Sequence, residues 1–241
     1  MLKKILKDKS LTAKAIFGLF PANSVGDDIE VYNSDKTEVI ARFLTLRQQI
    51  KKKEGEPNIA ISDFIAPKDS KIDDYIGCFC VSTGFGSDEL SKQYEDKIDD
   101  YNSIMVKAIA DRLAEACAEY LHKQVRLDKW GYSSNENLDN KELIKESYKG
   151  IRPAPGYPAC PDHLEKTTIW ELLDVEKAIG VKLTENKAMW PASSISGYYF
   201  GNEKSKYFGL GNINEDQLKD YSKRRNISLE KARKWLSPNL N

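Results

Sequence analysis

Hydrophobic positions in the N-terminal third of the chain fall in short runs separated by polar or proline-containing segments. Residues 2–15 differ from this pattern, because their apolar residues recur at helical spacing among lysines and predict a helix. The following short runs predict strands at 15–21, 29–32, 39–46, 58–65 and 74–81. The connections between them are hairpin-like, which favours antiparallel pairing over a doubly wound parallel sheet.

The middle and C-terminal parts of the chain change to a helical period. Residues 88–129 carry two apolar stripes with many alanines and predict a long helix packed closely on the sheet. Further helices are predicted at 135–148 and 167–179, and two short ones between 214 and 236. Two aromatic strands, at 193–200 and 206–210, are predicted to be joined by a polar turn. This mixture of antiparallel strands and helices indicates an α+β fold.

Composition removes several classes of function. The 241 residues carry 37 Lys+Arg and 37 Asp+Glu, whereas a nucleic-acid-binding domain is normally basic. A C-terminal helix–turn–helix that reads DNA is therefore disfavoured, although arginines and a lysine suited to it are present at Arg224, Arg225, Arg233 and Lys234. The sequence has no apolar run of the ~20 residues that a membrane-spanning helix needs. We expect a soluble, cytoplasmic protein that binds neither nucleic acid nor membranes.

The cysteines do not form a pattern typical of a metal site. Cys78 and Cys80 lie in a predicted buried strand, Cys117 and Cys160 stand alone, and the chain has only two histidines. Ligand pairs at zinc spacing are missing, so we expect small core residues in a reducing compartment and no metal site. The Gly-Phe-Gly sequence at 84–86 lacks the other residues of a phosphate-binding loop and predicts a strand-to-helix turn.

The least ordinary segment is the proline-rich stretch at 150–163. Four prolines fix an extended, stiff path, and that path carries the side chains of Arg152, Tyr157 and His163. Stiff loops that carry charged and aromatic side chains are typical of binding sites. A plain interdomain linker is the alternative. Elsewhere, Asp111 and Glu115 share one face of the long predicted helix, where a solvated acidic edge is the simpler interpretation.

The stretch from Arg152 to His163 resembles the Arg-x-x-x-Gly-Tyr motif of one family, the C-terminal activation domain of cobalamin-dependent methionine synthase. Other blocks agree in the same register over nearly the whole chain, at 18–23, 26–30, 99–102, 110–115, 130–132, 188–191, 205–207 and 235–240. The resemblance implies a single α+β domain over residues 1–241, with a bent, mainly antiparallel sheet flanked by helices. It also implies an N-terminal truncation relative to the family, whose upstream Asp-Trp-Thr-Pro-type segment contributes an acid to the ligand site.

The resemblance implies that the domain binds S-adenosylmethionine. The ligand residues carried over from the family are Arg152, Ala154, Gly156, Tyr157, Glu115, Tyr207 and Phe208. A guanidinium at Arg152 suits the ligand carboxylate, and an acid at Glu115 suits the ammonium. A tyrosine ring can face the sulfonium, and Gly156 allows the backbone to approach the ligand closely. No catalytic residue and no metal ligand are expected.

The family's role implies a reactivation module. Such a module would present the methyl group of S-adenosylmethionine to reduced cobalamin on a partner module, with a flavodoxin-like protein as electron donor, in support of methionine synthesis from homocysteine and methyltetrahydrofolate. The isolated chain would belong to a methyltransferase without being catalytic itself. One alternative is an independent S-adenosylmethionine-dependent methyltransferase, which usually has a glycine-rich strand–helix loop. The other is a non-catalytic interaction module whose proline loop docks a partner.

Overall fold

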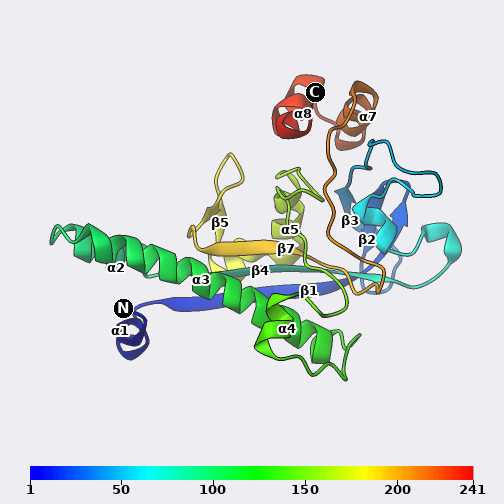
Figure 1. Cartoon of the computed structure of the whole chain (residues 1–241). Coiled ribbons are helices and arrows are strands. Elements are labelled where there is room, and N and C mark those ends of the chain that lie inside the picture. The colour runs from blue at the N-terminus through cyan, green and yellow to red at the C-terminus, as the bar shows by residue number, and fades with distance from the viewer. Residues whose placement is uncertain (241) are drawn as a thin grey trace. The chain divides into compact units, whose positions relative to one another are not determined.

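The computed structural model describes residues 1–240, and its main feature is a five-stranded sheet with the order β3-β2-β1-β4-β7 (Figure 1). Its strands are β1 (Thr12–Val25), β2 (Asp28–Tyr32), β3 (Val39–Leu44), β4 (Tyr75–Phe85) and β7 (Ser194–Tyr199). The pairs β1–β2 and β2–β3 are antiparallel. A separate two-stranded sheet pairs β5 (Lys182–Leu183) with β6 (Met189–Trp190). The predicted α+β class with an antiparallel sheet is confirmed.

The helices are spread along the whole chain. They are α1 (Leu2–Asp8), α2 (Ser87–Glu95), α3 (Asp100–Gln124), α4 (Asn140–Ile144), α5 (Glu165–Leu173), α6 (Val175–Ile179), α7 (Glu215–Arg225) and α8 (Leu229–Trp235). Short 3-10 turns lie at η1 (Ile61–Phe64), η2 (Lys68–Ser70) and η4 (Ser237–Asn239), and a π-helical turn, η3 (Val125–Lys129), follows α3.

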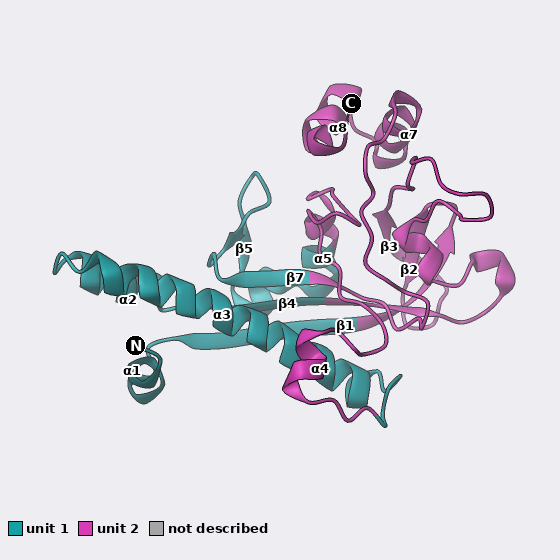
Figure 2. Cartoon of the chain, in the orientation of Figure 1, with its two compact units in different colours: residues 1–18, 79–135, 169–196 teal, residues 19–78, 136–168, 197–241 magenta. Residues whose placement is uncertain are grey.

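The chain forms two compact units, each built from three separate segments (Figure 2). Unit 1 comprises residues 1–18, 79–135 and 169–196, and unit 2 comprises residues 19–78, 136–168 and 197–241. Strands β1, β4 and β7 each have residues in both units.

In unit 1, small side chains let α3 approach its neighbours closely. Ala110, Ala114 and Ala118 are buried on one face of α3, as the predicted alanine-rich packing requires. Near the start of this face, the hydroxyl of Thr83 donates a hydrogen bond to the carbonyl oxygen of Ala110 at 2.6 Å. The prediction of a single helix over 88–129 is wrong, because the chain breaks between α2 and α3. Asp99 begins α3 there by accepting a hydrogen bond from the Asn102 amide at 3.1 Å.

In unit 2, aromatic and aliphatic side chains build the core around β3 and the C-terminal helices. Phe43 packs edge-to-face on Tyr198, with ring centroids 4.9 Å apart. A second cluster of buried residues joins the end of β3 to α7 and α8: Leu44, Leu46, Leu210, Ile213, Leu218, Tyr221, Ala232 and Leu236. The two predicted C-terminal helices are therefore confirmed, and burial of their apolar faces accounts for their position.

Several predicted elements are wrong or have other boundaries. The residues at 58–65 form the 3-10 turn η1 rather than a strand, and those at 206–210 form no strand. The helix expected at 2–15 ends at Asp8, and β1 then runs from Thr12 to Val25, beyond both ends of the strand expected at 15–21. Long-range partners explain the extension of β1. Ser24, for example, donates its amide hydrogen to Ala66 and its hydroxyl to Ile65, both at 3.0 Å.

Predicted helices also prove shorter. The segment at 135–148 is helical only in α4, which starts at an Asp139 cap. The helix expected at 167–179 is divided into α5 and α6 by Asp174, whose φ of 48° is left-handed. The predicted strand-to-helix turn at 84–86 is correct in kind, although β4 continues to Phe85 before α2 begins.

Candidate functional site

The proline-rich loop at 150–163 is an ordered part of unit 2. Ile151 and Phe200 exchange both backbone hydrogen bonds, at 3.0 and 3.1 Å, and the Tyr198 amide donates to the Pro153 carbonyl at 2.9 Å. Pro153 and Pro155 are buried. The loop is thus fixed to the end of β7 and lies inside unit 2, which argues against the alternative of a plain interdomain linker.

A tight turn closes the middle of this loop. The Gly156 amide donates to the Cys160 carbonyl at 2.8 Å, and the Cys160 amide donates to the Tyr157 carbonyl at 2.9 Å. The Cys160 thiol also donates to the Ala154 carbonyl at 2.9 Å. The turn thereby holds Ala154, Gly156 and Tyr157, three of the predicted ligand residues, in one short segment.

Gly156 is required by the turn itself. Its φ of +96° is unfavourable for any residue with a side chain. In addition, a Cβ at this position would lie 2.1 Å from Cε1 of His163, because the imidazole ring occupies that space. The conformation of the loop therefore requires the glycine of the motif, in addition to any contact that it makes with a ligand.

Arg152 and Tyr207 come together across the loop. The backbone amide of Arg152 donates a hydrogen bond to the Tyr207 hydroxyl at 3.1 Å. The side chain of Arg152 is half-buried, whereas Tyr207 is 44% exposed and Tyr157 is 65% exposed. Phe208 follows Tyr207, and its ring packs edge-to-face on Phe64 at 6.2 Å. The hydrogen bond therefore ties the backbone at Arg152 to a partly exposed aromatic side chain.

Glu115, the remaining predicted ligand residue, belongs to unit 1. It is exposed on α3, one turn after Asp111, which accepts a hydrogen bond from the Ser193 hydroxyl at 2.6 Å. Both acids are exposed, in agreement with a solvated acidic edge. The contribution of Glu115 to a ligand site together with the loop stays a prediction.

The end of the loop carries a buried charge cluster. Asp162 and Glu165 have side chains only 3% and 2% exposed, and both form ion pairs with Nη2 of Arg225, the last residue of α7. The distance from this nitrogen to Oδ2 of Asp162 is 3.2 Å. Each acid has a second role, because Asp162 accepts from the Leu164 amide at 2.8 Å and Glu165 from the Leu44 amide at 3.2 Å. The cluster joins the loop, β3 and α7.

Burial dominates the electrostatics of this cluster. It raises the pKa of Asp162, and the attraction of Arg225 offsets only part of that rise. Burial likewise lowers the pKa of Arg225 and of Lys166. The pKa of His163 is also lowered, first by burial and then by the charge of Lys166. Asp162 and Arg225 therefore depend on each other for their charged states.

Arg224 forms a second buried ion pair beside the first. Its guanidinium contacts Asp28 on β2, donates to the Thr45 carbonyl at 3.1 Å, and pairs with Asp220 at 2.7 Å. Arg224 and Arg225 are thus engaged inside unit 2, which argues against a DNA-reading surface built on them. The acidic partners Asp28, Asp162 and Glu165 lie far from these arginines along the chain, so the sequence pattern alone does not reveal them.

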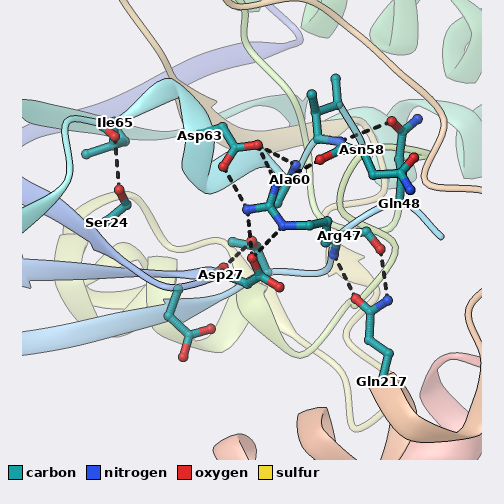
Figure 3. A network of polar contacts seen from close by, with 12 residues as sticks. Ser24, Asp27, Arg47, Gln48, Asn58, Ala60, Asp63, Ile65 and Gln217 are labelled. Carbon is teal, nitrogen blue, oxygen red and sulfur yellow. Dashed lines mark hydrogen bonds and ion pairs between the residues drawn. The ribbon is translucent and has the colours of Figure 1, made fainter. Parts of the chain in front are cut away.

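A third polar network surrounds Arg47 (Figure 3). Its guanidinium forms two hydrogen bonds to Asp63, both at 2.7 Å, and one to Asp27 at 2.8 Å. The side-chain amide of Gln217 accepts from the Arg47 amide and donates to its carbonyl. Burial opposes ionisation of Asp63, but hydrogen bonds from Arg47 and Ala60 outweigh it and lower the pKa of Asp63. This network explains why the segment after Arg47 folds into η1.

A hollow of about 580 Å³ lies next to this network, lined by Ser24, Val25, Gly26, Asp63, Ile65, Pro67, Lys68 and Asp69. Asp63 is paired with Arg47, and Lys68 is paired with Glu30 at 2.7 Å. The hollow lies among residues other than the predicted ligand residues.

The described part of the chain, residues 1–240, has neither a metal-binding cluster nor a membrane-spanning helix. Among them, no three His, Cys, Asp or Glu side chains are grouped so that they could hold a metal ion. Within the same range, no helix has the length and apolar character needed to cross a membrane. All four cysteines are free, and burial raises the pKa of the Cys80 thiol to about 12.

The family model described as "Vitamin B12 dependent methionine synthase, activation domain" matches residues 1–226. The chain belongs to this family. The family's activation domain is a part of methionine synthase, which is a methyltransferase. The chain is also similar to a crystal structure described as the MetH reactivation domain bound to AdoHcy. The TM-score is 0.97 and the sequence identity 55%, over 100% of this chain and 74% of the other. The predicted family is thereby confirmed, together with the α+β fold of the activation domain.

Proposed function

We propose that this activation domain binds S-adenosylmethionine on the loop at 152–157. The observation that carries the proposal is the ordered, proline-braced loop, in which the Arg152 backbone amide donates a hydrogen bond to the hydroxyl of Tyr207. The similar reactivation domain, which was crystallised with AdoHcy, supports a ligand of the adenosyl-sulfur class. The alternative of an interaction module without a nucleoside ligand has no comparable support.

The proposed contacts follow from the chemistry of each side chain. Arg152 binds the ligand carboxylate, for which a planar guanidinium offers paired donors. Tyr157 and Tyr207 present exposed rings that suit the positive sulfonium. Glu115 provides a negative partner for the ammonium. Ala154 and Gly156 contribute backbone groups, and Phe208 supports the segment that carries Tyr207.

We further propose that the domain presents the methyl group to cobalamin held by a separate module of methionine synthase. When bound there, reduced cobalamin supplies the nucleophile for methyl transfer. This chain's residues then bind the donor, orient its methyl group and limit the access of water, and orientation of this kind can supply a large part of a rate enhancement. A flavodoxin-like electron donor is the proposed second partner. The isolated chain should bind ligand without turning it over.

Calorimetric titration with S-adenosylmethionine tests the binding site. Arg152→Ala should weaken binding by about 10- to 150-fold, because loss of a charge-assisted hydrogen bond costs roughly 1.5–3 kcal/mol. Lys149→Ala is the matched control, since Lys149 forms an exposed ion pair with Glu203 just before the loop. Unchanged affinity in Arg152→Ala, or an equal loss in both variants, would contradict the proposed role of Arg152.

A turnover assay separates the proposal from the alternative of an independent methyltransferase. Formation of S-adenosylhomocysteine by the isolated chain with small methyl acceptors would favour an independent methyltransferase.

A further inference from the structure

We propose that Arg225 is a positioning residue for the ligand loop, acting through Asp162 and His163. This inference rests on the proposed function, because it takes the turn at 154–160 to be the ligand-binding element. Arg225 itself lies at the end of α7 and need not touch the ligand.

The connection consists of four contacts. Arg225 forms ion pairs with Asp162 and Glu165, which follow the turn in sequence. Asp162 precedes His163, and its Oδ1 accepts from the Leu164 amide, so its carboxylate sets the course of the backbone there. The His163 ring fills the space beneath Gly156. The position of α7 is thereby transmitted to the middle of the turn.

The two acids need the guanidinium because both are buried. Without Arg225, two carboxylates with side chains 3% and 2% exposed would lose their shared cation. Removing one partner of a buried ion pair leaves a charge that is costly to keep away from water. The nearby cations are less suitable substitutes, since Arg224 pairs with Asp28 and burial lowers the pKa of Lys166. We therefore expect the segment to move toward solvent when Arg225 is replaced.

Arg224 provides a matched comparison within the same turn of α7. It too forms a buried ion pair, but its partners are Asp28, Asp220 and the Thr45 carbonyl. Replacing Arg224 should therefore weaken the attachment of α7 to β2 and β3. Replacing Arg225 should in addition displace the ligand loop. The two variants separate a general loss of stability from a specific loss of loop position.

The test uses the full chain with Arg225→Met, Arg225→Lys, Arg224→Met and the double variant Arg225→Met/Glu165→Gln. Calorimetry gives the Kd for S-adenosylmethionine, and thermal unfolding gives the midpoint of each variant. Arg225→Met should raise Kd by at least about tenfold, because it leaves buried charges unpaired. Arg225→Lys should give an intermediate value, and Arg224→Met should change Kd less than about twofold while lowering the midpoint. The double variant should recover part of the affinity, since it removes one of the unpaired charges.

Amide hydrogen exchange without ligand distinguishes failure of this inference from failure of the proposed function. The amides of Gly156 and Cys160, which close the turn, should exchange faster in Arg225→Met than in Arg224→Met. Equal exchange in these two variants, or equal effects on Kd, would overturn the positioning role. If the parent chain does not bind S-adenosylmethionine but Arg225→Met still exchanges faster than Arg224→Met, the positioning of the loop by Arg225 stands and the proposed ligand is refuted. Should Arg225→Met fail to fold, Arg225→Lys and Asp162→Asn provide the same comparison.

Discussion

Replacing Gly156 by alanine tests the geometry of the ligand loop without changing any charge. The added methyl group meets two obstacles. The backbone φ of +96° is one that residues with a side chain rarely adopt, and the new Cβ would lie 2.1 Å from Cε1 and 2.5 Å from Nδ1 of His163. Both atoms belong to a ring that is itself half-buried, so the ring or the turn must move.

The expected loss of stability follows from these two obstacles. A left-handed conformation costs a residue with a Cβ roughly 1–2 kcal/mol. Forcing a methyl group into an occupied space costs about 1–3 kcal/mol. Gly156→Ala should therefore lower the free energy of unfolding by about 2–5 kcal/mol. The lower conformational entropy of alanine in the unfolded chain offsets part of this, by roughly 0.4–1 kcal/mol.

Urea unfolding of three variants separates these contributions. Gly26 has a φ of +60° with open space around its absent Cβ, so Gly26→Ala carries the backbone cost alone. Gly209 has open space and no positive φ, so Gly209→Ala should be close to neutral. The Gly156→Ala/His163→Ala double variant, compared with His163→Ala, should recover the steric part. A Gly156→Ala variant no less stable than Gly26→Ala would show that the His163 ring does not fill this space.

Three further predictions concern other parts of the fold. The folded-state pKa of Asp63 is lowered, so its contribution to stability is present above the unfolded pKa of about 3.9 and is lost as the pH falls through the folded value. In urea unfolding, Asp63→Asn should therefore lower the free energy of unfolding more at pH 7 than at pH 3. Ala114→Leu should lower the free energy of unfolding by about 1–3 kcal/mol, because Ala114 is buried on the closely packed face of α3. An equal loss in Ala116→Leu, whose side chain is exposed, would contradict this. Cys78 and Cys80 should react with a thiol reagent at pH 8 only after unfolding, since burial raises the pKa of both thiols. Rapid labelling of these two cysteines in the native protein, located by mass spectrometry, would disprove this prediction.

Elements with strong local signals were predictable from the sequence. The hydrophobic runs that became β2 and β3 were found, as were the two C-terminal helices. Ser228 begins α8 by accepting a hydrogen bond from the Lys231 amide at 3.2 Å. The break before α3 also had a local signal, because Asp99 and Asn102 have the spacing of a helix cap. The apolar stripes on both sides of this cap nevertheless favoured one continuous helix.

Elements that depend on distant partners were not predictable in the same way. The segment at 58–65 has the composition of a strand, yet the guanidinium of Arg47 and its bonds to Asp63 hold it in a 3-10 turn. At the candidate site, the motif identified the loop residues, but the pairing of Arg225 with Asp162 and Glu165 joins positions far apart in the sequence. Local periodicity carries no information about such pairs.

The most direct test of the central proposal is methyl transfer between modules. The chain is mixed with S-adenosylmethionine labelled in its methyl group, a reductant, and either free cobalamin or the cobalamin-binding module of a methionine synthase. Radioactivity in the cobalamin fraction is then followed over time. Transfer should be much faster with the module than with free cobalamin, and it should fall in Arg152→Ala at limiting ligand, because docking supplies the orientation that free reactants lack. Equal rates for free and module-bound cobalamin, or transfer that does not depend on this chain, would contradict the proposal.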